Sequence, residues 1–575
     1  MVHIKYRGFV VSDFTIDRFV HQLNSDDELP VIESVSTPFG QVTQVLLDNS
    51  LEYWKNNPDF AIIWTQPATA IHTFNSLLHF DKVSLKDILQ EVDKYCALLL
   101  NICDKVNLIF VPSWVLPPFY RGLGMLDMKY NTGITNVLMQ MNLRLSLNFD
   151  KESNIYLLNT SRWISTVGEK AFNPKLWYMG KMIFEKEVFI EVIKDVKSAL
   201  RGAAGSSKKM IVLDLDDTLW SGTVGEIGWK TLVLGGHDPI GEALVDFQKA
   251  LKSFVNRGIM LGIVSKNEES VALEAINSHP EMVLKLSDFA GWKINWGDKA
   301  RNIIDLVSEL NMGLQSVVYI DDNPVERAYV RETLPEVLVP EWPKDKMLYK
   351  KALMSLTYFD TPFISKEDIE RTKMYVTDRK RQHLKIKNDS VDKWLSTLET
   401  RVKIEDLNDA NLQRIIQLLN KTNQMNLTTR RMTESELLRW AKNNDNKLWA
   451  FRAMDKFGEL GLIGIISLEI QDKVGKITDF ILSCRALGRK IEEVMIYTAI
   501  MYARSKTLNK VYAKYLATPK NKPCLEFWKK TGFKHYESDD HFEWAVENDF
   551  IFPKSIQVQG EIALEKKPNP KTGQV

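Results

Sequence analysis

The middle of the chain alternates short apolar runs with amphipathic segments. Apolar runs at 210–213, 259–264 and 316–320 are each followed at once by polar residues, and helical periodicity fills the stretches between them. Continuous apolar runs of this length are typical of strands buried on both faces, as in a parallel sheet covered by helices. The pattern predicts an α/β domain over residues 208–345, with polar groups gathered at the carboxyl ends of its strands.

Each flanking region has its own short apolar runs that predict strands: 60–64, 106–111 and 155–158 before the middle domain, and 448–454, 461–469 and 476–483 after it. Residues 1–200, which end at a small-residue linker, are predicted to form a separate α/β domain, and residues 401–550 an α+β domain. Residues 346–400 are expected to form a charged helical connector, and 551–575, rich in Lys, Pro and Gly, a flexible tail. The sequence therefore predicts a multidomain α/β protein.

The strand predicted at 210–213 runs directly into the acidic sequence DLDDTLWSGT. Alternation along an extended chain sends Asp214 and Asp216 the same way, with Thr218 following. At a strand end, and screened by a divalent cation, one carboxylate can attack phosphorus while its neighbour moves protons. An isolated pair with this spacing is more often a solvated acidic turn, so the assignment to phosphoryl transfer depends on residues downstream.

The second apolar run is followed by residues that suit the same chemistry. Ser265, Lys266 and Asn267 come directly after it, and their hydroxyl and N–H groups could hold phosphate oxygens. Asn267 is also expected to cap the helix that follows. With Thr218, these residues form the expected phosphate-binding set.

Basic and acidic groups complete the series. Lys299 opens a helix predicted at 300–310, where an ammonium would stabilise charge on a phosphoryl group during transfer. Lys293 competes for this role, and the position of Lys299 at a helix start favours Lys299. The next apolar run stops at Asp321 and Asp322, carboxylates suited to Mg²⁺.

This ordered series of acidic, hydroxyl, basic and acidic residues resembles the four motifs of the haloacid dehalogenase superfamily. The resemblance implies that Asp214 is the nucleophile that forms an aspartyl-phosphate. Asp216 would be the general acid/base, and its backbone carbonyl would help to hold the metal. Lys299 would neutralise charge, and Asp321 would ligate Mg²⁺, with Asp322 as a direct or outer partner of the metal.

Composition limits the class of protein. The 575 residues indicate about three to four domains, and 75 basic against 74 acidic side chains give no support to a nucleic-acid binder. The N-terminus lacks a signal-like pattern, and no apolar run approaches the roughly 20 residues that span a bilayer. Four cysteines without disulfide or zinc spacing fit a reducing compartment. We expect a soluble cytoplasmic protein that binds neither nucleic acid nor membrane.

Cys484 lies in the sequence KITDFILSCRALGRK, where a predicted strand ends and a helix is expected from Gly488 to about Lys506. A thiol near a helix N-terminus and beside Arg485 should ionise more readily than a free cysteine, which makes it a candidate nucleophile. An inert buried role is the alternative, since free cysteine is among the most buried residue types. The other three cysteines lack this setting and are expected to pack in cores.

The segment after Cys484, together with NKPCLEFWKKTGF, resembles the acetyl-CoA-binding core of the GNAT N-acetyltransferase fold. The phosphate-cradling loop of that fold has a small residue where Lys490 stands here. A side chain at this position would crowd the approach of the loop backbone to pyrophosphate. Ordinary acetyl-CoA binding is therefore in doubt, whereas a phosphopantetheine arm would need less of that cradle.

Together the two halves resemble the FkbH-like glyceryl-transferring proteins of polyketide pathways, through DLDDTLWSGTVGE, INWGDKARNI, YIDDNPVER, LLNKTNQMNLTTRR and LSCRALGR. The resemblance covers most of the chain. It implies removal of phosphate from 1,3-bisphosphoglycerate with Mg²⁺, and transfer of the glyceryl group through Cys484 to the phosphopantetheine thiol of an acyl carrier protein. The candidate substrate contacts, for which an ordinary place on the polar surface is the alternative, are Asn423, Gln424, Asn426, Arg430, Arg431 and Arg485.

The same resemblance gives the N-terminal domain an SGNH-hydrolase type of fold. Such enzymes open with Gly-Asp-Ser, and the best match here, Ser12-Asp13-Phe14, has phenylalanine at the nucleophile position. We therefore expect a non-catalytic scaffold or docking module. Two other functions stay open for the whole chain: a plain Mg²⁺-dependent phosphatase with a ligand-binding GNAT-like domain, and an acyl-CoA-dependent acyltransferase, against which Lys490 counts.

Overall fold

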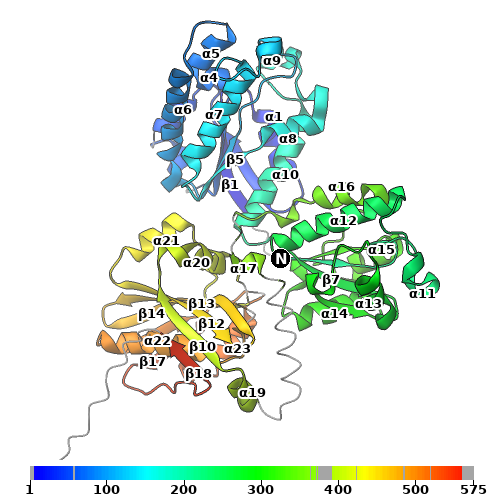
Figure 1. The fold of residues 1–575 in the computed structure, drawn as a ribbon. Helices are drawn as coiled ribbons and strands as arrows, with labels where there is room; N and C mark the ends of the chain where they lie inside the picture. The colour runs from blue at the N-terminus through cyan, green and yellow to red at the C-terminus, as the bar shows by residue number, and fades with distance from the viewer. Residues whose placement is uncertain are drawn as a thin grey trace, which may run out of the picture. The chain divides into compact units, whose positions relative to one another are not determined.

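The computed structural model describes residues 5–48, 50–55, 58–362, 364, 366–370, 372, 391–422, 424–483, 486–518 and 520–559. The chain divides into two compact units, Met1–Arg201 and Gly202–Val575. Both units combine strands with helices, and the second contains a parallel sheet and a separate mixed sheet (Figure 1). The multidomain α/β architecture expected from the sequence is confirmed.

The first unit is built on a parallel sheet with the strand order β2-β1-β3-β4-β5. Trp64 at the end of β3 contacts Phe19 of α1 and Phe189 of α10 on one face, while α6 and α7 pack together on the other (Figure 1). The strands are β1 (Lys5–Ser12), β2 (Val31–Ser36), β3 (Phe60–Trp64), β4 (Leu108–Pro112) and β5 (Ile155–Leu158). The helices are α1 (Asp17–Ser25), α2 (Val42–Leu47), α3 (Glu52–Lys55), α4 (Pro67–Ala70), α5 (His72–Leu78), α6 (Leu85–Leu100), α7 (Ile134–Phe149), α8 (Thr160–Val167), α9 (Pro174–Gly180) and α10 (Lys186–Ala203).

The second unit begins with a parallel sheet in the order β8-β7-β6-β9, in which β6, β7 and β9 are buried along their whole length. Helices α12 and α13 cover one face, and α14 and α15 the other. Helices on both faces explain the continuous apolar runs of these strands. The elements are β6 (Met210–Leu213), α11 (Val224–Ile227), α12 (Pro239–Asn256), β7 (Met260–Ser265), α13 (Glu269–Ser278), β8 (Phe289–Ile294), α14 (Lys299–Glu309), β9 (Val317–Ile320) and α15 (Pro324–Thr333).

The chain after this sheet returns to it. The 3₁₀ turn η7 (Lys346–Leu348) is followed by helix α16 (Tyr349–Met354), which packs on α12. The Tyr349 ring contacts both Phe247 and Trp342, and Leu353 is fully buried. The sequence assigns this stretch to a connector, whereas its apolar residues complete the core beneath α12.

The C-terminal part holds a mixed sheet in the order β16-β17-β15-β14-β13-β12-β10-β18. Helix α22 packs on one face, and α20 and α21 on the other. The strands are β10 (Thr400–Asp406), β11 (Met425–Asn426), β12 (Asn446–Asp455), β13 (Gly458–Gln471), β14 (Val474–Leu482), β15 (Lys510–Lys514), β16 (Lys534–Tyr536), β17 (His541–Ala545) and β18 (Ile556–Gln559). The helices are α17 (Lys366–Ile369), α19 (Val391–Thr397), α20 (Asp409–Lys421), α21 (Glu434–Ala441), α22 (Ile491–Ser505) and α23 (Lys522–Trp528).

Strand β14 has different neighbours along its length. Its first half pairs in parallel with β15, whereas its last residues, Ile481 and Leu482, pair with the short strand β11 on the same edge. The expected start of the next helix at Gly488 is wrong. Gly488 and Lys490 both have a positive φ, which is incompatible with helical backbone, so α22 begins only at Ile491.

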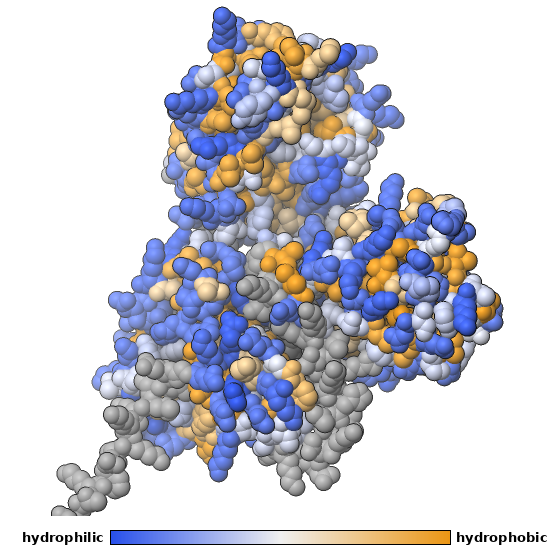
Figure 2. All heavy atoms as spheres, in the orientation of Figure 1, coloured by the Kyte–Doolittle hydropathy of each residue, from blue (hydrophilic) through white to orange (hydrophobic). Residues whose placement is uncertain are grey.

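Hydrophobic and hydrophilic side chains are interspersed over the visible face of each part of the chain (Figure 2). Exposed apolar side chains include Met125, Tyr178 and Met179 in the first unit and Trp296 and Val325 in the second. Among the helices that the structure describes, none combines the length and the apolar character needed to cross a membrane.

The packing of α16 can be tested with two neighbouring residues. Leu353 is 0% exposed and Met354 is 57% exposed. We expect Leu353→Ala to lower the free energy of unfolding of the central domain by about 2–5 kcal/mol, since it leaves a cavity in the core. Met354→Ala is the matched control and should change it by less than about 0.5 kcal/mol. Equal effects of the two variants in urea unfolding would contradict this packing.

Candidate active site

The predicted phosphoryl-transfer residues meet at the carboxyl edge of the central sheet. Asp214 directly follows β6, which lies between β7 and β9, and its backbone N–H donates to the carbonyl of Ile320 at 3.0 Å. Ser265 is the last residue of β7, and Asp321 follows β9. Lys299 is the first residue of α14. The parallel topology thus gathers four separate segments at one place, as the sequence predicts.

A buried ion-pair arrangement forms the centre of the site. The Lys299 Nζ donates a hydrogen bond to Asp321 Oδ2 at 2.6 Å and lies 3.2 Å from Asp214 Oδ1. All three side chains are at least nine-tenths buried. Burial alone would lower the pKa of Lys299, but the two carboxylates outweigh it and raise that pKa, so the ammonium stays charged.

Within this group, the carboxyl of Asp214 has a perturbed pKa and an oxygen without an aligned hydrogen bond. Burial raises the pKa of its carboxyl above the ordinary range, and the neighbouring Asp321 carboxylate adds to the effect, while Lys299 opposes it. Its Oδ1 is buried and accepts no aligned hydrogen bond from any described residue, although Lys299 lies close. A buried oxygen that accepts no aligned hydrogen bond is suited to bind a cation or to attack an electrophilic phosphorus.

Asp214, Asp321 and Asp322 together could hold a metal ion. Each offers a carboxylate oxygen, and the three oxygens lie within 4.8 Å of one another. The spacing and the hard oxygen donors fit a cation such as Mg²⁺, which completes its shell with water and substrate. The orphaned Oδ1 of Asp214 fits the same conclusion.

The two adjacent carboxylates differ in their hydrogen bonds. Asp321 accepts from Lys299 and from the hydroxyl of Tyr319 on Oδ2, and from the backbone N–H of Asn323 on Oδ1. No described side chain donates to the carboxylate of Asp322, whose pKa is raised by burial and by the Asp321 charge. Asp322 is therefore the freer candidate ligand for a metal, and Asp321 is the carboxylate that holds Lys299 by a hydrogen bond.

Asp216 is oriented by three donors from the loop after β6 and from the end of β7. Its Oδ1 accepts from the indole Nε1 of Trp220 at 2.8 Å and from the backbone N–H of Val224 at 3.0 Å. Its Oδ2 accepts from the side-chain amide of Asn267 at 3.0 Å. The carboxylate is thus held on both oxygens, which suits a group that exchanges protons at a fixed place.

The expected helix cap at Asn267 is wrong. Helix α13 begins after Glu268 without a side-chain cap, because the Asn267 amide donates instead to Asp216 and, at 3.3 Å, to the hydroxyl of Ser265. No local pattern predicts this contact, since it joins residues 51 positions apart.

The other predicted phosphate ligands have partners of their own. The hydroxyl of Thr218 accepts the backbone N–H of Asp322 at 3.2 Å, and Lys266 pairs with Glu326 at 2.7 Å on the surface. Ser265 is 1% exposed and lies in the site. Lys293, the rival of Lys299, pairs with Glu309 away from the acidic group. Ser265 and Lys299 are therefore the best placed of the predicted phosphate contacts.

The predicted residues of the C-terminal part are placed only in part. Cys484, Arg485 and Asn423 lie outside the described residues. Arg430 forms an ion pair with the buried Asp479 and stacks on Trp440. The others bind within their own domain or are half-buried: Asn426 donates to the Thr422 carbonyl, Arg431 donates to the Leu419 carbonyl, and Gln424 is half-buried before β11.

A backbone N–H group in the loop before α22 donates a hydrogen bond to a side chain of that helix. The side chain of Glu492, which is 4% exposed, reaches back and accepts the backbone N–H of Gly488 at 2.7 Å. Burial raises the pKa of this carboxyl to about 7. The Glu492 side chain thus accepts the Gly488 N–H, a donor that an anionic ligand would otherwise use at this helix end.

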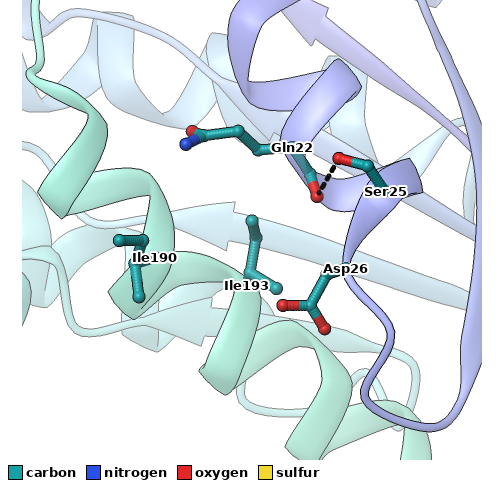
Figure 3. A pocket seen from close by; sticks show the side chains of 5 residues that line it. All are labelled: Gln22, Ser25, Asp26, Ile190 and Ile193. Carbon is teal, nitrogen blue, oxygen red and sulfur yellow. Dashed lines mark hydrogen bonds between the residues drawn. The ribbon is translucent and has the colours of Figure 1, made fainter.

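The first unit has no comparable centre among its described residues. The Asp13 carboxylate, at the end of β1, accepts the backbone N–H of Gln66 at 2.9 Å, and burial raises its pKa to about 6. A cavity of about 240 Å³ between α1 and α10 is lined by Gln22, Ser25, Asp26, Ile190 and Ile193 (Figure 3). None of these lining residues is basic, so the cavity offers no positive charge to a phosphate group.

Comparison with known proteins supports the assignment of the central domain. No family model and no curated protein matches the chain. Among solved structures, the N-terminal part of the protein BF1531 from Bacteroides fragilis contains a phosphatase domain complexed with Mg. It is 27% identical with a TM-score of 0.57, over 63% of this chain and 95% of that one.

Two acetyltransferases match a smaller part. A GNAT-family acetyltransferase from Staphylococcus aureus is 12% identical with a TM-score of 0.21, over 25% of this chain and 99% of its own. The PaiA N-acetyltransferase from Thermoplasma acidophilum, solved with coenzyme A, is 18% identical with a TM-score of 0.21, over 25% of this chain and 98% of its own. The central domain is thus similar in fold to a phosphatase domain complexed with Mg, and its acidic, hydroxyl and lysine residues occur in the order of the haloacid dehalogenase motifs.

The buried Glu492 carboxyl makes stability depend on pH. Its ordinary pKa near 4.3 in the unfolded chain is raised to about 7 in the folded one, so the folded state retains the proton over that interval. The stability it contributes is present at low pH and is lost as the pH rises through about 7. Glu492→Gln, which stays neutral, should therefore gain roughly 2 kcal/mol over wild type between pH 5 and pH 8.

Thermal unfolding at the two pH values measures this difference. Glu459→Gln is the control, since Glu459 is exposed and the variant should follow the wild-type pH dependence. Parallel pH profiles for wild type and Glu492→Gln would contradict the prediction.

Proposed function

We propose that the chain is a Mg²⁺-dependent enzyme that removes phosphate from a phosphorylated three-carbon acid, 1,3-bisphosphoglycerate, and passes the glyceryl group to an acyl carrier protein in polyketide-type biosynthesis. The observation that carries the first half is the buried Asp214, Lys299 and Asp321 group with the orphaned Asp214 oxygen. The Mg-bound phosphatase domain of the Bacteroides fragilis protein supports the choice of metal. Bound through Asp214 and Asp322, the cation would offset the excess negative charge.

The chain's own residues supply two steps. Asp214 attacks phosphorus, and the bond from phosphorus to the leaving oxygen breaks while Asp216 delivers a proton to that oxygen. Lys299 and Ser265 stabilise the charge on the phosphoryl oxygens. Water then attacks the aspartyl-phosphate and gives its proton to Asp216, and inorganic phosphate leaves with Asp214 restored.

The second half uses a thiol. The Cys484 thiolate attacks the carbonyl of the acyl phosphate, and the carbon–oxygen bond to phosphate breaks, so that a glyceryl thioester forms without ATP. Exchange with the phosphopantetheine thiol of the carrier moves the acyl group and frees Cys484. The support for this half is the sequence resemblance and the place of Cys484 beside Arg485 in the sequence.

A plain Mg²⁺-dependent phosphatase is the second candidate. It is favoured by the fact that every placed phosphoryl-transfer residue comes from the central domain alone. An acyl-CoA-dependent acyltransferase is less well supported, because Glu492 accepts the N–H of Gly488, and Lys490 stands in the same loop where the GNAT pattern has a small residue.

The different contacts of Asp321 and Asp322 predict different defects. Asp322→Asn removes the freer carboxylate and should raise the Mg²⁺ concentration for half-maximal phosphate release at least 10-fold, with turnover recovered at saturating metal. Asp321→Asn weakens the hold on Lys299 and should lower turnover about 100-fold even at saturating Mg²⁺. Steady-state kinetics over a Mg²⁺ series measures both. The same metal dependence in the two variants would contradict this division of roles.

Intact-protein mass spectrometry separates the two candidate functions. After incubation with 1,3-bisphosphoglycerate and Mg²⁺, we expect a glyceryl adduct on wild type and none on Cys484→Ala, because the thioester needs the thiol. Cys524→Ala is the matched control, since Cys524 is fully buried, and it should keep the adduct.

Phosphate release without an adduct in any of these proteins would support the plain phosphatase instead. Asp214→Asn should abolish phosphate release from the monoester, and substantial residual turnover would exclude Asp214 as the nucleophile.

A further inference from the structure

We propose that Trp220 and Asn267 are positioning residues that hold Asp216 for both of its proton transfers, an inference that rests on the phosphatase function proposed above. Trp220 donates to Asp216 Oδ1 at 2.8 Å, and Asn267 donates to Oδ2 at 3.0 Å. The backbone N–H of Val224 is the third donor, at 3.0 Å. Donors on both oxygens fix the plane of the carboxylate as well as its position.

The loop that carries Asp216 explains why such support is needed. Asp217, the next residue, has φ 54°, so the chain turns sharply just after the acid/base residue. The same carboxyl group must reach the leaving oxygen in the first step and the attacking water in the second. Displacement of a reacting group by about 1 Å can cost about 10²-fold in rate.

Both supporting side chains are themselves fixed. Trp220 is 1% exposed and packs in the core with Leu219 and Val224. Asn267 is 2% exposed, and its amide also lies 3.3 Å from the hydroxyl of Ser265. Asn267 therefore links the acid/base residue to the predicted phosphate-binding hydroxyl across β6 and β7.

The test uses Trp220→Phe and Asn267→Ala with p-nitrophenyl phosphate, followed by rapid mixing. Nitrophenolate leaves without a proton, so formation of the aspartyl-phosphate does not need Asp216, whereas its hydrolysis does. Trp342→Phe is the matched control, because Trp342 lies in the same core, is 5% exposed, and its indole N–H has no hydrogen-bond partner among the described residues.

We expect Trp220→Phe and Asn267→Ala to release a burst of nitrophenolate approaching one equivalent per enzyme. Steady-state turnover should then be at least 10-fold slower than in wild type, with KM lowered because the phosphoenzyme accumulates, and with phosphoenzyme detectable by mass. Trp342→Phe should show wild-type kinetics. Loss of turnover without phosphoenzyme, or a defect in Trp342→Phe equal to that in Trp220→Phe, would overturn the proposal. A raised KM without a burst in Asn267→Ala would assign that residue to substrate binding instead.

A second measurement does not depend on turnover. In ¹⁵N-labelled protein, the indole signal of Trp220 is the one that Trp220→Phe lacks, and Asp216→Ala should shift it because its acceptor is removed. An unshifted signal would overturn the contact. If wild type releases no phosphate from any phosphomonoester while the indole signal does shift, the proposed phosphatase function fails and the contact stands.

Discussion

A buried ammonium between two buried carboxylates determines the chemistry of the central domain. Lys299 lies 2.6 Å from Asp321 and 3.2 Å from Asp214, and burial removes the water that would otherwise screen these charges. With Asp322 close by, three carboxylates face one ammonium. Burial raises the pKa of both Asp214 and Asp322, and the neighbouring Asp321 carboxylate adds to the rise, so keeping all three groups ionised is costly in the free protein. A divalent cation held by Asp214 and Asp322 would offset this cost and favour the ionised form of Asp214.

The parts of this site that the sequence predicts are those that depend on strand ends. Asp214 and Asp321 follow apolar runs that are strands buried on both faces, and a parallel sheet brings their carboxyl ends together without further information. Lys299 follows the same logic, since it is the first residue of a helix that starts at this edge. Periodicity and strand order therefore account for the positions of Asp214, Lys299 and the acidic pair Asp321 and Asp322.

The contacts that sequence reasoning missed include two between near neighbours in the sequence and two between distant parts of the chain. Trp220 has the pattern of an ordinary core residue, and Asn267 that of a helix cap, yet both donate to Asp216. Tyr319 lies two residues before Asp321 in the sequence, and an extended chain turns both side chains to the same face, so alternation alone is compatible with the hydrogen bond between them. In the C-terminal part, the sequence makes Arg430 a candidate for binding an anionic ligand, but its guanidinium forms an ion pair with the buried Asp479. Local patterns cannot show which partner a polar side chain will find.

The two parallel sheets of the chain show that carboxylates at the same place in a fold can differ in their hydrogen bonds. In the first unit, the carboxylate after β1 is satisfied by the backbone N–H of Gln66 from the adjoining strand end. In the central sheet, the carboxylate after β6 has an oxygen that accepts no aligned hydrogen bond from a described residue, although the Lys299 ammonium lies 3.2 Å from it. Both edges lie at the carboxyl ends of parallel strands, so topology alone does not separate them. The difference is in hydrogen-bond satisfaction, because a group whose bonding capacity is used within the chain has little left for a substrate.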